Sequence, residues 1–410
     1  MKERAILHSD ANCFYASCEM VLNPSLRGKA VAVCGNVEER HGIVLAKSEL
    51  AKKKGVKTGM PNWEALKLCP ELIIVPPQFE YYAKFSRLLK EIYQRYTDLV
   101  EPFGLDECWL DVSDSIKSPM EIAEEIRQAV KDELGLTVSI GVSFNKVFAK
   151  LGSDLKKPDA ITEITRENYK SKIWHLPCSE LLYCGRQMTK HLESLFVRTI
   201  GDIAVLPEDY MERKFGKNGH ALWLFANGLD DSRVAHKDHY TPPKSIGHGI
   251  TCVENLVNFE EAKKVIASLS QDIGYKLRKE GMWARGISVT VKDKNLLTQS
   301  FQTRLENGTQ DEFTITRVAF ELLSKSYNFK DHIRAITVTA INLESVETPT
   351  QASLFFDFEA EKKRKALSSV IDDINNTYGK KSIVPALILD ESKMPNNTQK
   401  DTVLPGMMHK

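Results

Sequence analysis

The pattern of apolar and polar residues over roughly the first 165 positions predicts alternating strands and helices. Short apolar runs, typical of buried strands, are followed by stretches in which apolar residues recur every three or four positions. Strands are expected at 5–9, 30–34, 72–75, 108–112 and 137–142, and helices at 14–20, 48–54, 60–69, 79–96 and 122–134. This alternation predicts an α/β or α+β arrangement.

The pattern changes in the second half of the chain. Residues 166–231 are mostly helical in character, and a Pro-containing linker is expected at 239–244. Beyond it, period-two alternation predicts half-buried strands at 287–292, 298–304 and 336–340, with helices at about 259–280 and 311–326. A last helix would carry Leu367, Val370, Ile371 and Ile374 on one face. The second half should therefore contain a small α+β domain.

Composition places the chain among globular proteins. The 410 residues include 56 Lys and Arg against 55 Asp and Glu, for a formal net charge of +1, and 42% are hydrophobic. These values exclude a collagen-like or wholly disordered chain, and the length suggests two to four domains. Any basic surface for a nucleic acid must be local and balanced by acidic residues elsewhere.

The sequence also bears on location. No apolar run reaches the length of a membrane-spanning helix, and the N-terminus lacks the pattern of a secretory signal. The eight cysteines include no C-x-x-C pair, so we expect reduced thiols and no zinc site. We therefore expect a cytoplasmic protein without a membrane partner.

Three carboxylates near the ends of predicted strands carry the most chemical information. Asp10 closes the first strand, and the adjacent Asp106 and Glu107 precede the strand at 108–112. Neighbouring residues of a regular strand point to opposite faces, so this pair can converge only at a turn, which Gly104 permits. Mg²⁺ would neutralise such a cluster because it binds few carboxylates and completes its coordination with water and substrate phosphates. An acidic pair at a turn is more often solvated surface, but this one lies within an apolar run.

Several motifs, in order and at matching spacing, resemble those of the Y-family, or translesion, DNA polymerases. Residues 10–19 resemble the first motif of that family, and residues 104–111 resemble its second, acidic motif. The third motif is similar to the segments 139–143, 145–146, 149–150 and 153–159. The resemblance covers roughly residues 5–345 and implies a mixed α+β, multidomain right-hand fold.

The resemblance points to a bacterial member and leaves its branch open. Asn12 and Lys52 resemble the catalytic subunit of polymerase V, whereas residues 153–159 are more similar to polymerase IV. Ala46 and Glu49 stand where many members carry a phosphate-contacting threonine and tyrosine, and we expect Glu49 to be solvated surface. These substitutions bear on nucleotide affinity rather than on the metal site.

The resemblance also divides the chain into the parts of a polymerase hand. We expect a palm at 1–18 and 77–165, fingers at 19–76, a helical thumb with a helix-hairpin-helix at 166–238, a linker at 239–244, a little finger at 245–345, and a tail at 346–410. The tail would hold a clamp-binding peptide and a helix.

By the same resemblance, the acidic cluster would be the catalytic centre. Asp10, Asp106 and Glu107 would be the catalytic residues and would hold two Mg²⁺ ions, helped by the backbone carbonyl of Ala11. Two such ions activate an attacking hydroxyl and stabilise a leaving pyrophosphate.

Four residues would contact the incoming nucleotide, namely Phe14, Tyr15, Lys52 and Lys157. Tyr15 matches the steric-gate position, where an aromatic ring would clash with a ribose 2′-OH, although ordinary packing on a helix is the alternative. Lys157 matches a triphosphate-binding lysine. Lys52 stands where many members carry an arginine and would supply charge without a bidentate fork.

Two regions would contact DNA. In the thumb, the resemblance to a helix-hairpin-helix implicates Gly185, Arg186, Thr199 and Gly201, because a glycine turn lets backbone N–H groups approach phosphates. Tyr183 replaces the first glycine usual in such hairpins, so a plain helical turn stays an alternative. In the little finger, one polar sheet face would present Ser288, Thr290, Lys292 and Arg304 to phosphates. An ordinary solvated sheet face is equally compatible with that spacing.

Residues 351–355 resemble the pentapeptide by which bacterial polymerases bind the sliding clamp, the beta subunit. Leu354 and Phe355 would enter an apolar pocket while Gln351 forms a hydrogen bond at its edge. Folding of Leu354 and Phe355 onto the C-terminal helix is the alternative.

Together these features predict a template-directed, Mg²⁺-dependent DNA polymerase that acts in translesion synthesis, with low fidelity and no proofreading. Its partners would be primed template DNA, dNTPs and the sliding clamp, and it would be a monomer. Two rival functions stay open. A palm-type nucleotide cyclase would need the same three acids but no thumb or little finger. A non-catalytic DNA-binding scaffold would have no need of the acids.

Overall fold

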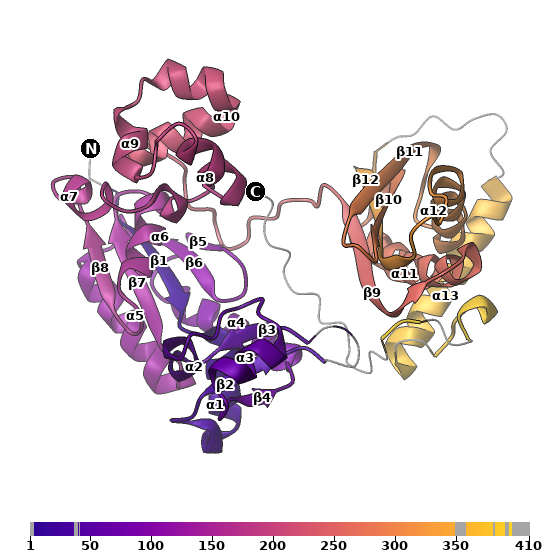
Figure 1. The fold of residues 1–410 in the computed structure, drawn as a ribbon, viewed down its shortest axis with the longest axis horizontal. Coiled ribbons are helices and arrows are strands. Elements are labelled where there is room, and N and C mark those ends of the chain that lie inside the picture. The colour runs from indigo at the N-terminus through magenta and orange to yellow at the C-terminus, as the bar shows by residue number, and fades with distance from the viewer. Residues whose placement is uncertain are drawn as a thin grey trace. The chain divides into compact units, whose positions relative to one another are not determined.

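The computed structural model describes residues 4–36, 40, 42–348, 358–379, 382–389 and 393–395. The chain divides into two compact units, with the main division between His239 and Tyr240 (Figure 1). Among the helices of the described residues, none combines the length and the apolar character that crossing a membrane requires.

A five-stranded sheet forms the centre of the first unit. Its order is β5-β6-β1-β7-β8, with β1 antiparallel to both of its neighbours. The strands are β1 (Ile6–Ala11), β5 (Val100–Pro102), β6 (Glu107–Asp111), β7 (Val138–Ser143) and β8 (Ile161–Ile164). Every residue of β1 is buried, including the polar His8, Ser9 and Asp10, so both faces of this strand are covered.

Helices pack against both faces of this sheet. They are α1 (Phe14–Leu22), α4 (Phe79–Tyr93), α5 (Pro119–Leu134) and α6 (Lys146–Leu155). Leu7 shares a core with Leu89 of α4 and Ile126 of α5. On the other face of β1, Ile6 packs with Ala149 of α6. Odd and even positions of β1 therefore face different helices.

A small three-stranded sheet of order β3-β2-β4 lies between α1 and α4 in the sequence. Its elements are η1 (Pro24–Leu26), β2 (Val31–Cys34), β3 (Val44–Lys47), α2 (Glu49–Lys53), α3 (Asn62–Leu68) and β4 (Ile73–Val75). Its buried core is built mainly from alanine, cysteine and valine. Small side chains bury little apolar area, so this segment gains less stability from its core than the central sheet does.

The rest of the first unit is helical. It comprises α7 (Tyr169–Ile173), η2 (Cys178–Glu180), α8 (Arg186–Glu193), α9 (Ile200–Val205) and α10 (Glu208–Ala226). Phe148 and Leu151 of α6 share a core with Ile200 of α9. Helix α6 therefore packs against the central sheet and also against the helical segment.

The second unit contains an antiparallel sheet of order β11-β10-β12-β9. Its elements are β9 (Ile246–Leu256), α11 (Phe259–Lys279), β10 (Met282–Asp293), β11 (Thr298–Thr309), α12 (Glu312–Ser326) and β12 (Ile333–Ser345). Ile287, Val289 and Val291 are buried and pack in one core with residues of α11 and α12, as the period-two pattern predicts.

The pattern of the sequence did not predict β9, which contains two glycines. A Cβ atom at Gly249 would lie 2.2 Å from Thr337 Oγ1, so the close approach of β12 requires glycine there. Glycine lowers strand propensity and hides the alternation. The short strands β5 and β8 were missed as well.

The last helix, α13 (Phe358–Tyr378), packs through its polar side, and a short η3 (Ala386–Ile388) follows it. Arg278 of α11 donates to Asp372 from Nε at 2.6 Å and from Nη2 at 2.8 Å, and from Nη1 to Glu312 at 2.9 Å. Leu367 and Val370, the start of the predicted apolar face, are 53% and 54% exposed. The apolar residues have the predicted helical spacing, but Leu367 and Val370 do not attach the helix to the rest of the unit.

Candidate active site

The three predicted acids are brought together by the pairing of β1 with β6. Asp10 lies directly opposite Glu107, so the two side chains share a face of the sheet. The Ala11 N–H donates to the Asp106 carbonyl at 3.1 Å. Gly104, with φ of +93°, permits the turn between β5 and β6 that places Asp106 just before the strand. The structure thus provides the hairpin that adjacent acids need in order to converge.

Burial and mutual repulsion raise the pKa of two of these acids. Burial is the main cause that raises the pKa of Asp106 to about 7, and Asp10 and Glu107 raise it further. Burial also raises the pKa of Asp10 to about 6, although Lys157 opposes the rise. Negative charge at these positions is therefore incompletely balanced by the protein, and a cation would stabilise both carboxylates.

Glu107 behaves differently because it has its own donors. Burial alone would raise its pKa, but hydrogen bonding from His8 and the positive charge of Lys150 outweigh burial and lower the pKa to about 2. His8 Nε2 lies 3.3 Å from Glu107 Oε2, and Lys150 Nζ lies 2.5 Å from the same oxygen. On the other side of the ring, His8 Nδ1 lies 2.8 Å from Ser153 Oγ. Glu107 is therefore the one acid of the three whose pKa is lowered rather than raised.

Lysines of α6 and the residues after it balance the charge of Asp10 and Glu107. Lys157 Nζ lies 2.6 Å from Asp10 Oδ2 and 2.8 Å from Asp154 Oδ1. Across the described residues, no group of three or more His, Cys, Asp or Glu side chains is arranged as a finished metal site. The carboxylate oxygens are the ligands that Mg²⁺ prefers, so the donor chemistry fits, but Lys150 and Lys157 must turn aside for it.

Tyr15 is half-buried in the first turn of α1, beside the acids. Its ring stacks on Tyr82 with centroids 4.4 Å apart and meets Phe79 edge to face at 6.0 Å. The Tyr82 hydroxyl donates to the buried Glu19 carboxylate, which fixes the ring beneath Tyr15. Burial and the charge of Asp106 raise the pKa of Tyr15. Phe14 is only 3% exposed and belongs to the core, so its side chain is not available to a ligand.

Lys52 and Glu49 lie on α2. The Lys52 side chain is half exposed, and its Nζ lies 3.8 Å from Glu49 Oε1. Glu49 also accepts a hydrogen bond of 3.1 Å from Cys13 Sγ. The expectation that Glu49 is plain solvated surface was wrong, because this carboxylate joins α2 to the residue that precedes α1.

The four helix-hairpin-helix residues divide into two kinds. Gly185 caps the exposed N-terminus of α8, which begins at Arg186. Thr199 instead caps α9 in a capping box with Asp202, and the Gly201 N–H donates to the Trp174 carbonyl at 2.9 Å. Of these four residues, Gly185 and Arg186 therefore lie at a helix N-terminus that is open to solvent, whereas Thr199 and Gly201 do not. Tyr183 adopts a φ of +67°, the left-handed backbone that glycine usually supplies.

In the second unit, the polar residues of β10 alternate with its buried ones. Ser288 and Thr290 are half-buried and Lys292 is exposed. Thr290 Oγ1 lies 2.8 Å from Ser300 Oγ on β11, which places both side chains on the same face. Arg304 is exposed on β11 as well. The proposed clamp peptide, 351–355, lies outside the described residues.

Comparison with known proteins adds independent evidence. Residues 9–154 match the impB/mucB/samB family, and residues 243–354 match the C-terminal domain of that family. A DNA polymerase IV of Acetivibrio thermocellus is 45% identical over 392 residues, which cover 95% of this chain and 98% of that protein. The chain belongs to the Y family of DNA polymerases. Within this family, the relative supports the polymerase IV branch, which the motifs alone left open.

Other members give the same picture. DNA polymerase IV 1 of Bacillus subtilis is 36% identical over 396 residues, covering 96% of this chain and 95% of that protein. A solved Y-family DNA polymerase chimera of Dbh and Dpo4 superposes with a TM-score of 0.74 at 24% identity, covering 83% of this chain and 99% of that one. The mixed α+β, multidomain fold of the Y family is therefore confirmed.

Sequence reasoning missed the residues that surround the acids of this Y-family member. His8 lies two positions before Asp10 on the same face of β1, and this period-two spacing could have indicated it. Lys150 and Asp154 were noted only as part of a motif. Lys150 and Asp154 are four residues apart on α6, and Lys157 follows the end of that helix three residues after Asp154. This spacing places the three side chains on one side, next to the acids.

Proposed function

We propose that this chain is a template-directed DNA polymerase that extends primers across damaged template. In the reaction, the primer 3′-OH attacks the α-phosphate of a dNTP, a new phosphodiester bond forms and pyrophosphate leaves. The observation that carries the proposal is the pairing of Asp10 against Glu107, with Asp106 at the hairpin turn beside them. The polymerase IV relative that matches 95% of the chain supports it.

Family membership implies dependence on a divalent metal, and we propose that the metal is Mg²⁺, bound as two ions. Asp10, Asp106, Glu107 and the Ala11 carbonyl would hold the ions. Bound Mg²⁺ would lower the pKa of the attacking hydroxyl and neutralise the leaving pyrophosphate. The raised pKa values of Asp10 and Asp106 support this assignment, because such carboxylates gain most from a nearby cation.

The lysines would then change partners during the reaction cycle. Lys157, which pairs with Asp10, would move to the triphosphate as that carboxylate binds metal. Lys52 on α2 would add charge near the same phosphates. Tyr15, held against Tyr82, would exclude ribonucleotides by contact with the 2′-OH. Phe14 would act only by keeping α1 in place.

The DNA would be held at two surfaces. We propose that Gly185 and Arg186 bind backbone phosphates at the N-terminus of α8, whereas Thr199 and Gly201 support the hairpin. The face with Ser288, Thr290, Lys292 and Arg304 would follow the duplex without reading its sequence. The parts of the hand are proposed with the boundaries given above. The small core of residues 19–76 is consistent with loose closure over the nucleotide and low fidelity.

Other parts of the proposal concern partners and location. We propose that residues 351–355 bind the sliding clamp through Gln351, Leu354 and Phe355, that the chain is a monomer, and that it works in the cytoplasm. The two rival functions are not favoured. The polymerase IV relative matches far beyond the palm, which a cyclase would not require, and a scaffold would gain nothing from three clustered acids.

Primer extension on primed template, with Mg²⁺ and all four dNTPs, tests the proposal. The intact chain should extend the primer, and the double variant Asp106→Ala, Glu107→Ala should lose extension while still binding the DNA. The matched control is Glu124→Ala, Glu125→Ala, which removes two adjacent acids from α5. Extension by the double variant, or DNA binding without extension by the intact chain, would contradict the proposal.

A further inference from the structure

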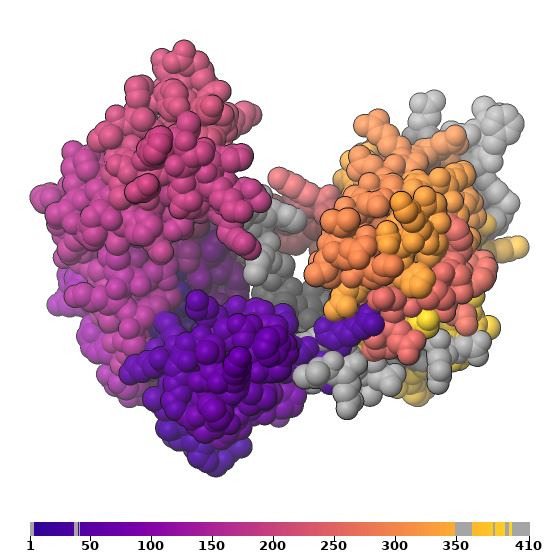
Figure 2. All heavy atoms as spheres, in the orientation of Figure 1, coloured from indigo at the N-terminus to yellow at the C-terminus, as the bar shows by residue number. Residues whose placement is uncertain are grey.

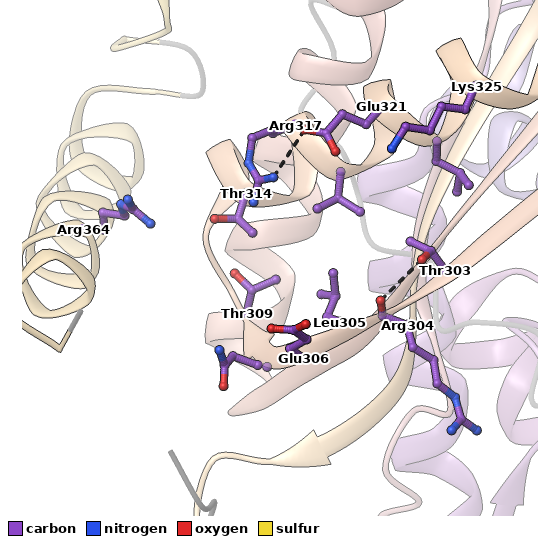
Figure 3. A pocket seen from close by; sticks show the side chains of 14 residues that line it. Thr303, Arg304, Leu305, Glu306, Thr309, Thr314, Arg317, Glu321, Lys325 and Arg364 are labelled. Carbon is purple, nitrogen blue, oxygen red and sulfur yellow. Dashed lines mark hydrogen bonds and ion pairs between the residues drawn. The ribbon is translucent and has the colours of Figure 1, made fainter. Parts of the chain in front are cut away.

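A groove of about 470 Å³ lies between β11 and α12, within the second unit (Figure 3). Its floor is apolar, because Leu305, Val318 and Leu322 line it and are only partly buried against the sheet core. In Figure 2 the orange segment that contains these elements forms part of the visible surface of the unit. The floor therefore offers apolar side chains that a ligand could cover.

The rim of the groove is mainly basic. Arg317 and Lys325 come from α12 and Arg364 from α13. Glu306 and Glu321 also line it, and Arg317 Nη1 lies 3.3 Å from Glu321 Oε1 in an exposed pair. An exposed pair of this kind contributes little stability and exchanges partners readily. The rim can thus accept carboxylates from a ligand.

The backbone of β11 is irregular where it passes the groove. In the sheet formed by the described residues, β11 is an edge strand with β10 as its neighbour. Arg304 pairs with Gly286 and Thr309 with Ala284, so residues 305–308 face only Arg285. Within this bulge, Arg285 Nη1 donates to the Glu306 carbonyl at 3.3 Å. The side of β11 that faces away from β10 has no strand neighbour among the described residues of this sheet. Unpaired groups on an edge strand are a template for an added strand.

We infer that the groove binds an extended, acidic peptide of a partner protein. The peptide would add a strand to β11, place apolar side chains on Leu305 and Val318, and direct carboxylates to Arg317 and Lys325. The face of α12 from Thr314 to Lys325 is about 16 Å long at 1.5 Å per residue, which an extended peptide of about five or six residues fills.

A peptide explains these features better than DNA does. Phosphates would meet Glu306 and Glu321 and would leave the apolar floor uncovered. Arg304, which we assign to DNA, also lines the groove, so the peptide site is tested at Arg317 and Lys325 rather than at Arg304. The inference does not depend on the polymerase reaction, because the groove contains none of the catalytic acids.

The test measures binding of a fluorescein-labelled peptide, Asp-Leu-Asp-Phe-Asp-Leu, to the full chain by fluorescence anisotropy. We expect saturable binding that Arg317→Glu and Lys325→Glu each weaken by about tenfold, the effect of one lost charge-assisted contact. Lys330→Glu, an exposed charge reversal outside the groove, should change affinity by less than about twofold. A peptide with lysine in place of aspartate should not bind. Primer extension by Arg317→Glu should equal that of the intact chain.

Three results would overturn the inference. Equal binding of the acidic peptide by the intact chain and Arg317→Glu would show that the rim does not select it. Loss of single-stranded DNA binding in Arg317→Glu, with no effect on the peptide, would assign the groove to nucleic acid. Tighter peptide binding by a chain with alanine at 351–355 would show that the chain's own segment is the occupant.

Discussion

At the scale of single residues, Asp106 links the electrostatics of the site to stability. Its pKa rises from 3.8 to about 7 in the folded chain, mainly through burial. Between these values the folded carboxyl keeps a proton that the unfolded one has lost, so rising pH removes stability through this window. The full rise would correspond to about 4 kcal/mol at pH 8, and solvent screening of a part-exposed carboxyl reduces the expected effect to about 1–2 kcal/mol.

We therefore predict that Asp106→Asn raises the melting temperature at pH 8 in the presence of a chelator. The gain should shrink as the pH falls from 8 to 5. Thermal denaturation followed by circular dichroism measures it, with Asp114→Asn at an exposed turn as the control. A gain that is the same at both pH values would argue against the raised pKa.

Tyr15 carries a second prediction at this scale. Replacing it with alanine removes the ring that Tyr82 holds in place, so a ribonucleotide would no longer meet a clash. Selectivity for dNTPs over NTPs should fall by about 10- to 200-fold, the range that one steric contact supplies. Single-nucleotide insertion with dCTP and CTP measures this ratio. Tyr81→Ala, on the exposed side of α4, should leave the ratio unchanged, and equal ratios for both variants would refute the gate.

At the scale of elements, the sequence predicts what depends on local periodicity. The strands carrying Asp10 and Glu107, and their convergence, follow from short apolar runs, a turn glycine and the family motifs. His8 and Lys150 could not be assigned roles, because their contacts with Glu107 depend on how α6 packs over β1. The strand β9 could not be predicted, because Gly249 interrupts its alternating pattern. Glycine is needed there because Thr337, which is distant in the sequence, packs closely against it.

One buried cation, Arg278, links α13 to α11 and α12. Arg278 is paired with Glu312 and Asp372, and all three side chains are largely buried. Arg278→Met would leave two buried carboxylates without their cation, and removing one partner of a buried ion pair typically costs about 3–5 kcal/mol. We predict faster amide hydrogen exchange across residues 363–378 and a lower melting temperature. Arg317→Met removes an exposed arginine from α12 and should change neither quantity, and unchanged exchange in Arg278→Met would show that other contacts hold the helix.

At the scale of the whole molecule, near-neutrality shapes how DNA can be held. With 56 basic against 55 acidic side chains, the net charge gives no general attraction to a polyanion, so affinity must come from local cations, among which we propose Arg186. Each phosphate neutralised contributes about 0.9 to the slope of log affinity against log salt concentration. We predict that Arg186→Ala lowers affinity for primed DNA of any sequence and reduces this slope by about one. Fluorescence anisotropy over a salt series measures it. Arg95→Ala, which removes a cation already paired with Glu133, should keep the slope of the intact chain, and an unchanged slope in Arg186→Ala would remove the α8 N-terminus from the DNA surface.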